Sequence, residues 1–443
     1  MTLPVPDGEP ESVLRRAPFS DNPNVGLRGQ RAQQRILHAA LQVFGEVGYH
    51  PAGIVRITEV AGCSRASFYQ YFSSKEDVFR HLAGQVARQL TASAETIGAT
   101  TADRAGWQEL RAWIERHGEI YARYEPVFQA FQAAVESDDA VASGSDRILR
   151  RHVAGLRGKL AGATLPPGQV DGVIELLLQC LTRAPRVSDV LRTAVPSATL
   201  RQSRVRDALT DVVHRTLFGL DSAVNVRPSP KRRLPRVRLG AAVLDGLQAD
   251  VQAARDLTGA GARTLSALLE AAHDVLIARG YHGTRVDDVT TAAGVSHGAF
   301  YRYFENKDHL VRLLAIRAMQ RLSSAFDEIP DVAGDPGPAS SAALRRWLRR
   351  YASTNATEAA IIRVWVDATA DDPMLSLESA AALDWGRARM VRFLEPRGFG
   401  DVDTEALLLV VLIDAIGAHR RSPAAIEPAA LIIERGLLGI GRR

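Results

Sequence analysis

The sequence predicts an all-α protein built from two tandem helical units. Apolar residues recur at spacings of three and four along most of the 443-residue chain, which is the period of an amphipathic helix. Glycine and proline mark the joins between these stretches, and no run alternates convincingly enough to predict a strand. A long stretch of the chain also occurs twice, which predicts a second unit of the same fold.

The repeat defines the two units. Residues Gly48–Lys75 match Gly280–Lys307 without a gap, 232 positions later, and the shared pairs include Ala-Gly, Phe-Tyr and Tyr-Phe. Two later pairs of segments also match, at offsets of 232 and 220: Val170-Asp171 with Val402-Asp403, and Leu217-Phe218-Gly219 with Leu437-Leu438-Gly439. Because these matches extend far beyond the first stretch, we infer that the whole unit has been duplicated.

Composition indicates an ordinary globular protein. The net charge is only +5, from 55 basic and 50 acidic residues, so binding to nucleic acid would depend on local patches. Two cysteines, Cys63 and Cys180, are too few for a disulfide framework and fit a reducing cytoplasm. The longest apolar run, Ala406–Ile413, is far shorter than the roughly 20 residues of a membrane span, and no signal peptide is evident. We therefore expect a cytoplasmic protein without a membrane partner.

Helix ends and composition shifts divide the chain into six segments. Scattered prolines in the first 27 residues predict a flexible arm, because proline removes a backbone donor and fixes φ. The expected boundaries are 1–27 for the arm, 28–89 for the first helix-turn-helix domain, 90–220 for the first helical body, 221–260 for a basic linker, 261–321 for the second helix-turn-helix domain and 322–443 for the second helical body.

A helix-turn-helix can be followed residue by residue in the first unit. A short helix over Ile54–Val60 leads into a tight turn at Gly62, where a positive φ is convenient. Ser64 then caps a third helix, in which Phe68 and Phe72 share one inward face. Small, aromatic and polar residues occupy the other face, which suits insertion into a DNA major groove. Ser73 with Glu76 is expected to cap the helix that follows.

The second unit repeats this arrangement. Gly280 ends its first helix, and Ser296 caps a helix that carries Phe300 and Phe304 on the inward face. Lys75 and Lys307 fall in the first turn of the next helix of each unit, where an ammonium and free backbone N–H groups can together hold a phosphate.

These residues resemble the TetR family of regulators. The shared pattern is Ala-Gly, one residue, Ser, then Phe-Tyr-x-Tyr-Phe and a Lys three residues on, and it occurs in both units. The resemblance covers roughly 29–89 and 261–321 and is weak in the bodies. Gly53 and Arg285 depart from it, since the family usually has a Thr that caps the second helix. The resemblance implies two helix-turn-helix spans, 53–72 and 285–304, that bind a double-stranded DNA operator.

The resemblance also implies individual roles. The residues expected at DNA are, in the first unit, Ser64, Arg65, Ser67, Tyr69, Gln70, Tyr71 and Lys75, and, in the second, Ser296, His297, Ala299, Tyr301, Arg302, Tyr303 and Lys307. The tyrosines and lysines resemble backbone-contacting residues of the family. Base readout would fall to Arg65, Ser67 and Gln70 in one unit and to His297, Ala299 and Arg302 in the other.

Aromatic residues gather in both bodies. The resemblance implies an apolar effector pocket there, for a small apolar or lipid-like molecule, and the alternative for each residue is ordinary core. The candidates are Trp113, Tyr121, Tyr124, Phe128, Trp347, Tyr351 and Trp365.

The linker has two interpretations. Its basic run, Lys231–Arg238, is either a solvated connection, which we favour, or an arm that enters the minor groove. A short amphipathic helix is expected after it, over Ala241–Leu257.

Duplication bears on assembly. Proteins of the TetR family are homodimers that pair through their last two helices, and the stretches Val170–Leu181 and Ala406–Ile413 fall in the corresponding helices. We expect them to pair in cis and to form a monomeric pseudo-dimer, with a homodimer as the alternative. The two reading helices differ in sequence, so an asymmetric operator is expected.

Three classes of function are in view. The leading hypothesis is a ligand-responsive repressor, and the second is a DNA-binding activator or architectural protein without a ligand. An enzyme on a helical scaffold is not expected, since the His-Glu-x-x-His, Gly-x-Ser-x-Gly and P-loop patterns are absent from the sequence. No cofactor and no metal are predicted.

Overall fold

The protein was analysed as a computed structural model. It describes residues 26–49, 51–137, 139–160, 162–194, 201–221, 223–228, 230, 233–238, 258–368, 373–418 and 422–441. All regular secondary structure in these ranges is helical, so the predicted all-α fold class is confirmed. The expected arm, except for its last two residues, and the expected helix over 241–257 lie outside the described residues.

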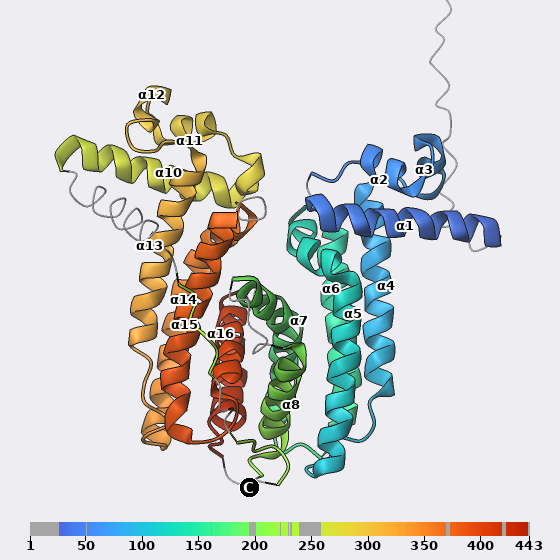
Figure 1. Ribbon diagram of the computed structural model, residues 1–443, viewed down its shortest axis with the longest axis vertical. Coiled ribbons are helices and arrows are strands. Elements are labelled where there is room, and N and C mark those ends of the chain that lie inside the picture. The colour runs from blue at the N-terminus through green and yellow to red at the C-terminus, as the bar shows by residue number, and fades with distance from the viewer. Residues whose placement is uncertain are drawn as a thin grey trace, which may run out of the picture. The chain divides into compact units, whose positions relative to one another are not determined.

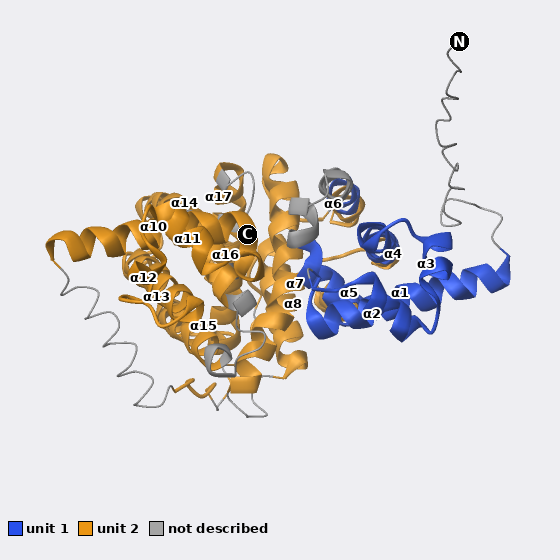
Figure 2. Cartoon of the chain, turned by 90° about the horizontal axis from the view of Figure 1, so that it is seen from above, with its two compact units in different colours: residues 1–92, 119–152 blue, residues 93–118, 153–443 orange. Residues whose placement is uncertain are grey.

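The chain forms two compact units (Figure 2). Unit 1 comprises residues 1–92 and 119–152, and unit 2 comprises residues 93–118 and 153–443. Unit 2 therefore holds the entire second sequence unit together with the last two helices of the first body. The six segment boundaries expected from the sequence stay a prediction.

Unit 1 contains the first helix-turn-helix head and the helices that support it. Helices α4, α5 and α6 each have residues in both units. Helix α5 bends at Tyr124, two residues before Pro126, because proline interrupts the helical hydrogen bonding of the preceding turn. The elements are α1 (Leu27–Val47), α2 (Ile54–Ala61), α3 (Arg65–Tyr71), α4 (Lys75–Thr96), α5 (Arg104–Ser137) and α6 (Asp139–Lys159).

Unit 2 contains the second head, its body and the helices that pair with that body (Figure 1). A π-helical turn, Ile432–Leu437, follows the last α-helix. The α-helices are α7 (Val170–Ala194), α8 (Gln202–Phe218), α10 (Gly259–Gly283), α11 (Val286–Ala293), α12 (His297–Phe300), α13 (Lys307–Asp327), α14 (Pro338–Ala368), α15 (Pro373–Leu394), α16 (Val402–Ala418) and α17 (Ser422–Leu431).

The two bodies pair within one chain. Helix α7 packs against α16 and α17, and α8 packs against α16 and the π-helical turn. In Figure 1, α7 and α8 run beside α16. The stretches Val170–Leu181 and Ala406–Ile413 lie in α7 and α16, so the expected cis contact is present. Their buried Leu, Ile and Val side chains supply the apolar area that favours this pairing.

The described part of the basic linker is docked on the second body. Arg236 Nε lies 2.6 Å from Asp384 Oδ2, which also accepts a bond from the Val237 N–H at 3.0 Å. The Leu234 side chain is buried, and its N–H donates to Asp403 Oδ2 at 3.2 Å. Residues 233–238 are therefore tied to acidic groups of α15 and α16, although Arg233, Arg236 and Arg238 stay exposed. Whether this segment enters a minor groove stays a prediction.

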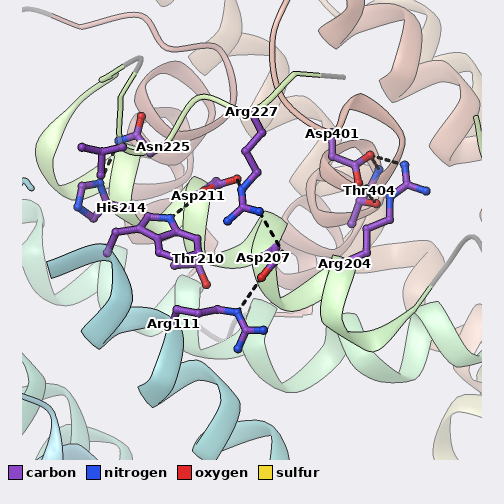
Figure 3. Close-up of polar contacts among 12 residues, drawn as sticks. Arg111, Arg204, Asp207, Thr210, Asp211, His214, Asn225, Arg227, Asp401 and Thr404 are labelled. Carbon is purple, nitrogen blue, oxygen red and sulfur yellow. Dashed lines mark hydrogen bonds and ion pairs between the residues drawn. The ribbon is translucent and has the colours of Figure 1, made fainter. Parts of the chain in front are cut away.

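The start of the linker is clamped as well. The Trp107 ring lies between two guanidinium groups, 4.4 Å from that of Arg104 and 4.7 Å from that of Arg227. Trp107 Nε1 donates to Asp211 Oδ1 at 2.8 Å, and Arg227 Nε lies 2.8 Å from Asp211 Oδ2. Figure 3 shows Arg227 reaching over α8 toward Asp211. Burial raises the pKa of Asp211 to about 6, and Arg227 opposes that rise.

Candidate nucleic-acid interface

Two glycines of each head make the turns that the motif needs. Gly62 and Gly294, between the second and third helices, have φ of 62° and 66°. Gly48, directly after α1, has φ of 80°, and Gly280, at a break in the last turn of α10, has φ of 68°. These backbone conformations favour glycine over any residue with a Cβ. The turn positions predicted from the repeat are therefore confirmed in both heads.

The third helix of head 1 is capped and anchored as expected. Ser64 Oγ accepts a hydrogen bond from the Ser67 N–H at 3.1 Å, which satisfies one of the free donors at the helix start. Phe68 and Phe72 are fully buried, and their ring centroids lie 5.9 Å apart. With this face inward, the opposite face of α3 is left to solvent.

Head 2 has the same cap and a shorter helix. Ser296 Oγ accepts from the Ala299 N–H at 3.3 Å, and Phe300 and Phe304 are fully buried with centroids 5.2 Å apart. Helix α12 nevertheless has only four residues, whereas α3 has seven.

The residues expected at DNA have the same exposure in both heads. Tyr69 is 48 % exposed and Tyr301 is 53 % exposed, which is unusual for a large ring in a folded protein. Ser64, Arg65 and Gln70 in one head, and Ser296, His297 and Arg302 in the other, are also exposed. Ser67, Tyr71 and Lys75, with Ala299, Tyr303 and Lys307, are half-buried. The repeat thus presents two similar surfaces with different side chains.

The lysines expected at phosphate have partners inside the protein. Lys75 Nζ donates to the backbone carbonyl of Tyr49 at 2.9 Å and lies 4.6 Å from the centroid of the Tyr49 ring. Lys307 Nζ donates to the carbonyls of Tyr281 at 2.7 Å and Thr284 at 3.1 Å. Burial lowers the pKa of both lysines. Each ammonium group therefore connects the first turn of α4 or α13 to the backbone that leads into the second helix of the same head. Sequence reasoning missed this role.

The cap of that next helix differs from the one expected. The predicted pair was Ser73 with Glu76. Instead, Ser74 Oγ accepts from the Asp77 N–H at 3.2 Å, and Asp77 Oδ2 accepts from the Ser73 N–H at 2.8 Å. The cap is shifted by one residue because α4 begins at Lys75, which makes Ser74 the capping position.

Head 2 also carries a histidine–aspartate contact on its candidate reading surface. His297 Nδ1 lies 2.6 Å from Asp287 Oδ1, and both side chains are more than half exposed. The equivalent positions in head 1 are Arg65 and Val55, so this pair has no counterpart there. The acidic pair Asp287-Asp288, in the first turn of α11, was the available signal.

The aromatic residues expected around effector pockets have different environments. Tyr124 and Phe128 pack against the core of head 1, and Tyr124 Oη accepts from Gln89 Nε2 at 2.8 Å. Tyr121 is buried, with its ring 5.0 Å from that of Phe128. Trp365 packs in the core of head 2, and its Nε1 has no partner among the described residues.

Trp347 and Trp113, the other two tryptophans expected around a pocket, differ in their hydrogen bonding. Trp347 stacks with Tyr351, 5.4 Å between centroids, and its Nε1 donates to the Ala325 carbonyl at 2.7 Å. Trp113 is also buried, but its Nε1 has no partner among the described residues. The same holds for Ser93 Oγ. A buried polar group without a partner costs about 1–3 kcal/mol, so these atoms of the first body stand out together with Trp365 Nε1 of the second.

Other site types were sought among the described residues. No group of three or more His, Cys, Asp or Glu side chains there could hold a metal ion. None of the helices that the structure describes has the length and apolarity needed to cross a membrane.

Capped third helices with exposed aromatic and polar faces, each after a glycine turn, define a helix-turn-helix protein with two heads. The family model of the bacterial regulatory proteins of the tetR family matches the chain twice, at residues 36–82 and 268–314. The two matches are 232 positions apart, which is the offset of the internal repeat. One segment in each head therefore matches the tetR family model, at the two places where the resemblance implied a helix-turn-helix.

Named relatives agree with this assignment over short spans. The transcriptional repressor AcnR of Corynebacterium glutamicum is 28% identical over 113 residues, 24% of this chain and 58% of that protein. The transcriptional activator FasR of Mycolicibacterium smegmatis is 36% identical over 92 residues, 20% of this chain and 41% of that protein. The chain thus spans roughly half the length of these relatives.

A solved structure was also found. It is described as a TetR-family transcriptional regulator from Mesorhizobium loti, is 20% identical, and aligns over 98% of its own length and 41% of this chain. Its TM-score is 0.32.

Proposed function

We propose that this protein is a DNA-binding transcriptional repressor that reads an asymmetric operator with two different recognition helices. One observation carries the proposal: the two heads expose equivalent positions, but Arg65, Ser67 and Gln70 in one are replaced by His297, Ala299 and Arg302 in the other. Donors and acceptors that differ in this way prefer different base edges. Cis pairing of the bodies supports a monomer that carries both heads. This function places the protein in the cytoplasm with its DNA.

Selection of duplexes from a random pool tests the proposal. We expect one asymmetric site whose two half-sites lie about one helical turn apart. Arg302→Gln, which gives head 2 the residue of head 1, should relax base preference in one half-site only. Gln70→Arg is the matched control and should change the other half-site. A selected site that is a perfect palindrome, or no selected site at low salt, would contradict the proposal.

We further propose that a small apolar or lipid-like effector binds the first body and releases the protein from DNA. Support comes from Trp113 Nε1 and Ser93 Oγ of the first body, which are buried and have no partner among the described residues. In the second body Trp347 Nε1 is hydrogen-bonded, and Trp365 Nε1 is buried without a described partner. A ligand with an apolar body and one polar group would satisfy the two atoms of the first body. Effector binding would then shift the population toward an arrangement with mis-spaced heads.

A thermal-shift screen with fatty acids and acyl-CoA compounds tests the effector. Trp113→Phe should abolish a ligand-induced shift in melting temperature, and Trp347→Phe should retain it. Transcription in vitro from a promoter with the selected site separates the two directions of regulation. A repressor lowers the transcript and the effector restores it, and a rise on adding the protein would instead indicate an activator.

A further inference from the structure

The two bodies have equivalent positions along the helices that pair. Helices α7 and α16 begin 232 positions apart, at Val170 and Val402. Helices α8 and α17 begin 220 positions apart, and glycines with positive φ, Gly219 and Gly439, follow the two segments at the same offset. Each residue of one pairing face therefore has a counterpart in the other. Comparing the residues at counterpart positions shows whether two first bodies, or two second bodies, could pair in the same arrangement.

Close packing at Gly436 excludes pairing of two first bodies. A Cβ added at Gly436 would overlap Thr216 Oγ1 and lie 2.8 Å from the Val212 carbonyl oxygen. At the offset of 220, the counterpart of Gly436 is Thr216 itself. Two first bodies in the same arrangement would therefore place one threonine against another, where the backbone approach leaves room only for glycine.

Close packing at Gly172 excludes pairing of two second bodies. A Cβ added at Gly172 would lie 2.5 Å from Pro428 Cγ, far inside van der Waals contact. At the offset of 232, the counterpart of Gly172 is Thr404. Two second bodies would therefore bring a threonine against the Pro428 ring, and neither group can move away without shifting its helix.

The ion pairs that the structure describes across the interface share one polarity, while Arg435 of the second body donates to the Thr164 carbonyl of the first at 2.8 Å. Arg215 and Glu405 are fully buried, with Arg215 Nη2 2.6 Å from Glu405 Oε2. In three ion pairs the arginine comes from the first body and the carboxylate from the second: Arg215 with Glu405, Arg204 with Asp401, and Arg183 with Asp414. Figure 3 shows Arg204 of α8 reaching toward Asp401.

The counterparts of these groups do not reproduce the pairs. The counterpart of Glu405 is Val173, so Arg215 would face an apolar residue if two first bodies paired. An uncompensated buried charge is strongly destabilising. The counterparts of Arg204 and Arg183 are alanines, Ala424 and Ala415, so two second bodies would leave Asp401 and Asp414 without an arginine.

We propose that the duplicated bodies have diverged into an obligate heterotypic pair, in which each pairing face binds the other and rejects a copy of itself. Three independent features carry this inference: glycine against threonine, glycine against proline, and arginines on one face against carboxylates on the other. The partner of each face is the other half of the same chain. This inference depends on neither DNA binding nor an effector.

A pull-down experiment on the unsubstituted sequence tests the proposal. The full chain is purified with a protease site between Gly240 and Ala241, in one form with a tag on the first half and in one form without a tag. The two folded forms are cleaved and then mixed. We expect the tagged half to retrieve the second half in a 1:1 ratio and the untagged first half at background level, at least tenfold lower. Retrieval of the untagged first half, or of no partner at all, would overturn the proposal.

A second experiment uses the undivided protein. Gly436→Thr gives the second face the residue of the first, and we expect its melting temperature to fall by about 5 °C or more, as overpacking of an interface predicts. The matched control is Gly155→Thr, at an exposed helical glycine with no heavy atom near its added Cβ, which should leave the midpoint nearly unchanged. Adding Thr216→Gly should restore part of the loss, because it removes the overlap with Thr216 Oγ1 and leaves the approach to the Val212 carbonyl oxygen. Equal effects in test and control, or no rescue, would count against heterotypic recognition.

Discussion

The third helices of the two heads expose equivalent residues but differ in regularity. Helix α3 extends from Arg65 to Tyr71, whereas α12 ends at Phe300 and continues as a turn. Gly298 stands in α12 where head 1 has Ala66, and glycine is less favourable than alanine in a helix by about 1 kcal/mol. In head 2 the Tyr303 N–H bonds to the Phe300 carbonyl at 3.0 Å, a tighter spacing than that of an α-helix. The length of the third helix therefore differs between the heads while the exposure of its equivalent residues does not, so different features determine the two.

The buried rings account for the similarity. In each head two phenylalanines four positions apart are fully buried in the head's core, so the chain between them must present the same residues to solvent whether or not it is regular helix. The comparison teaches that the anchors position the candidate reading surface. The intervening backbone decides only how rigid that surface is.

The largest expected effect comes from removing an anchor. Phe68→Ala and Phe300→Ala should each destabilise their own head by about 3–5 kcal/mol, because a fully buried ring leaves a cavity. Hydrogen exchange followed by mass spectrometry should show loss of protection confined to residues 27–96 for the first variant and 259–327 for the second. Equal losses would support the shared anchoring, and a much smaller loss in head 2 would break the comparison.

How much of this could be predicted from the sequence depends on the range of the interactions. The helical period, the glycine turns and the caps at Ser64 and Ser296 are local, and the sequence predicted them correctly. The docking of Arg236 on Asp384 was missed, because it joins segments 148 positions apart and no local pattern encodes it. The internal contacts of Lys307 were missed for the same reason. A repeat shows which residues correspond, but not what each one touches.

Caps should have the next largest effect. Ser64→Ala and Ser296→Ala each remove the side-chain acceptor at a helix start, which typically costs about 1 kcal/mol. Because α12 has only four residues, its cap satisfies a larger share of its backbone donors, and we expect the larger loss of unfolding free energy for Ser296→Ala. Urea unfolding of the full chain measures it, with threonine at each position as a control that keeps the hydroxyl.

Helix propensity offers a reciprocal exchange. Gly298→Ala should stabilise head 2 by up to about 1 kcal/mol and extend α12 toward Tyr303, since no heavy atom obstructs a Cβ there. Ala66→Gly should cost head 1 a similar amount. Amide exchange at residues 301–303 in the first variant and 69–71 in the second reports the change. If neither substitution changes the protection of these amides, Gly298 is not the reason that α12 is short.

The smallest effect concerns acid stability, which should separate the heads. In head 2 the Arg285 N–H donates to Asp288 Oδ2 at 2.9 Å, and Arg279 Nη1 lies 2.6 Å from Asp288 Oδ1. The hydrogen bond from Arg285, assisted by Arg279, holds the pKa of Asp288 below its usual value. At the equivalent position head 1 has Arg56, and the helix start at Gly53 has no side-chain cap.

The sign of the pH effect follows from linkage. A carboxyl group whose pKa is lower in the folded state stabilises that state above its unfolded pKa of about 3.9, and the contribution is lost as the pH falls below that value. Asp288→Asn should therefore lower the stability of head 2 slightly at pH 7, and the difference from the unsubstituted protein should shrink toward pH 3. Glu270→Gln, at an exposed position of α10, is the control. A deficit that persists undiminished at pH 3, or one that appears in head 1, would show that the charge of Asp288 does not distinguish the two heads.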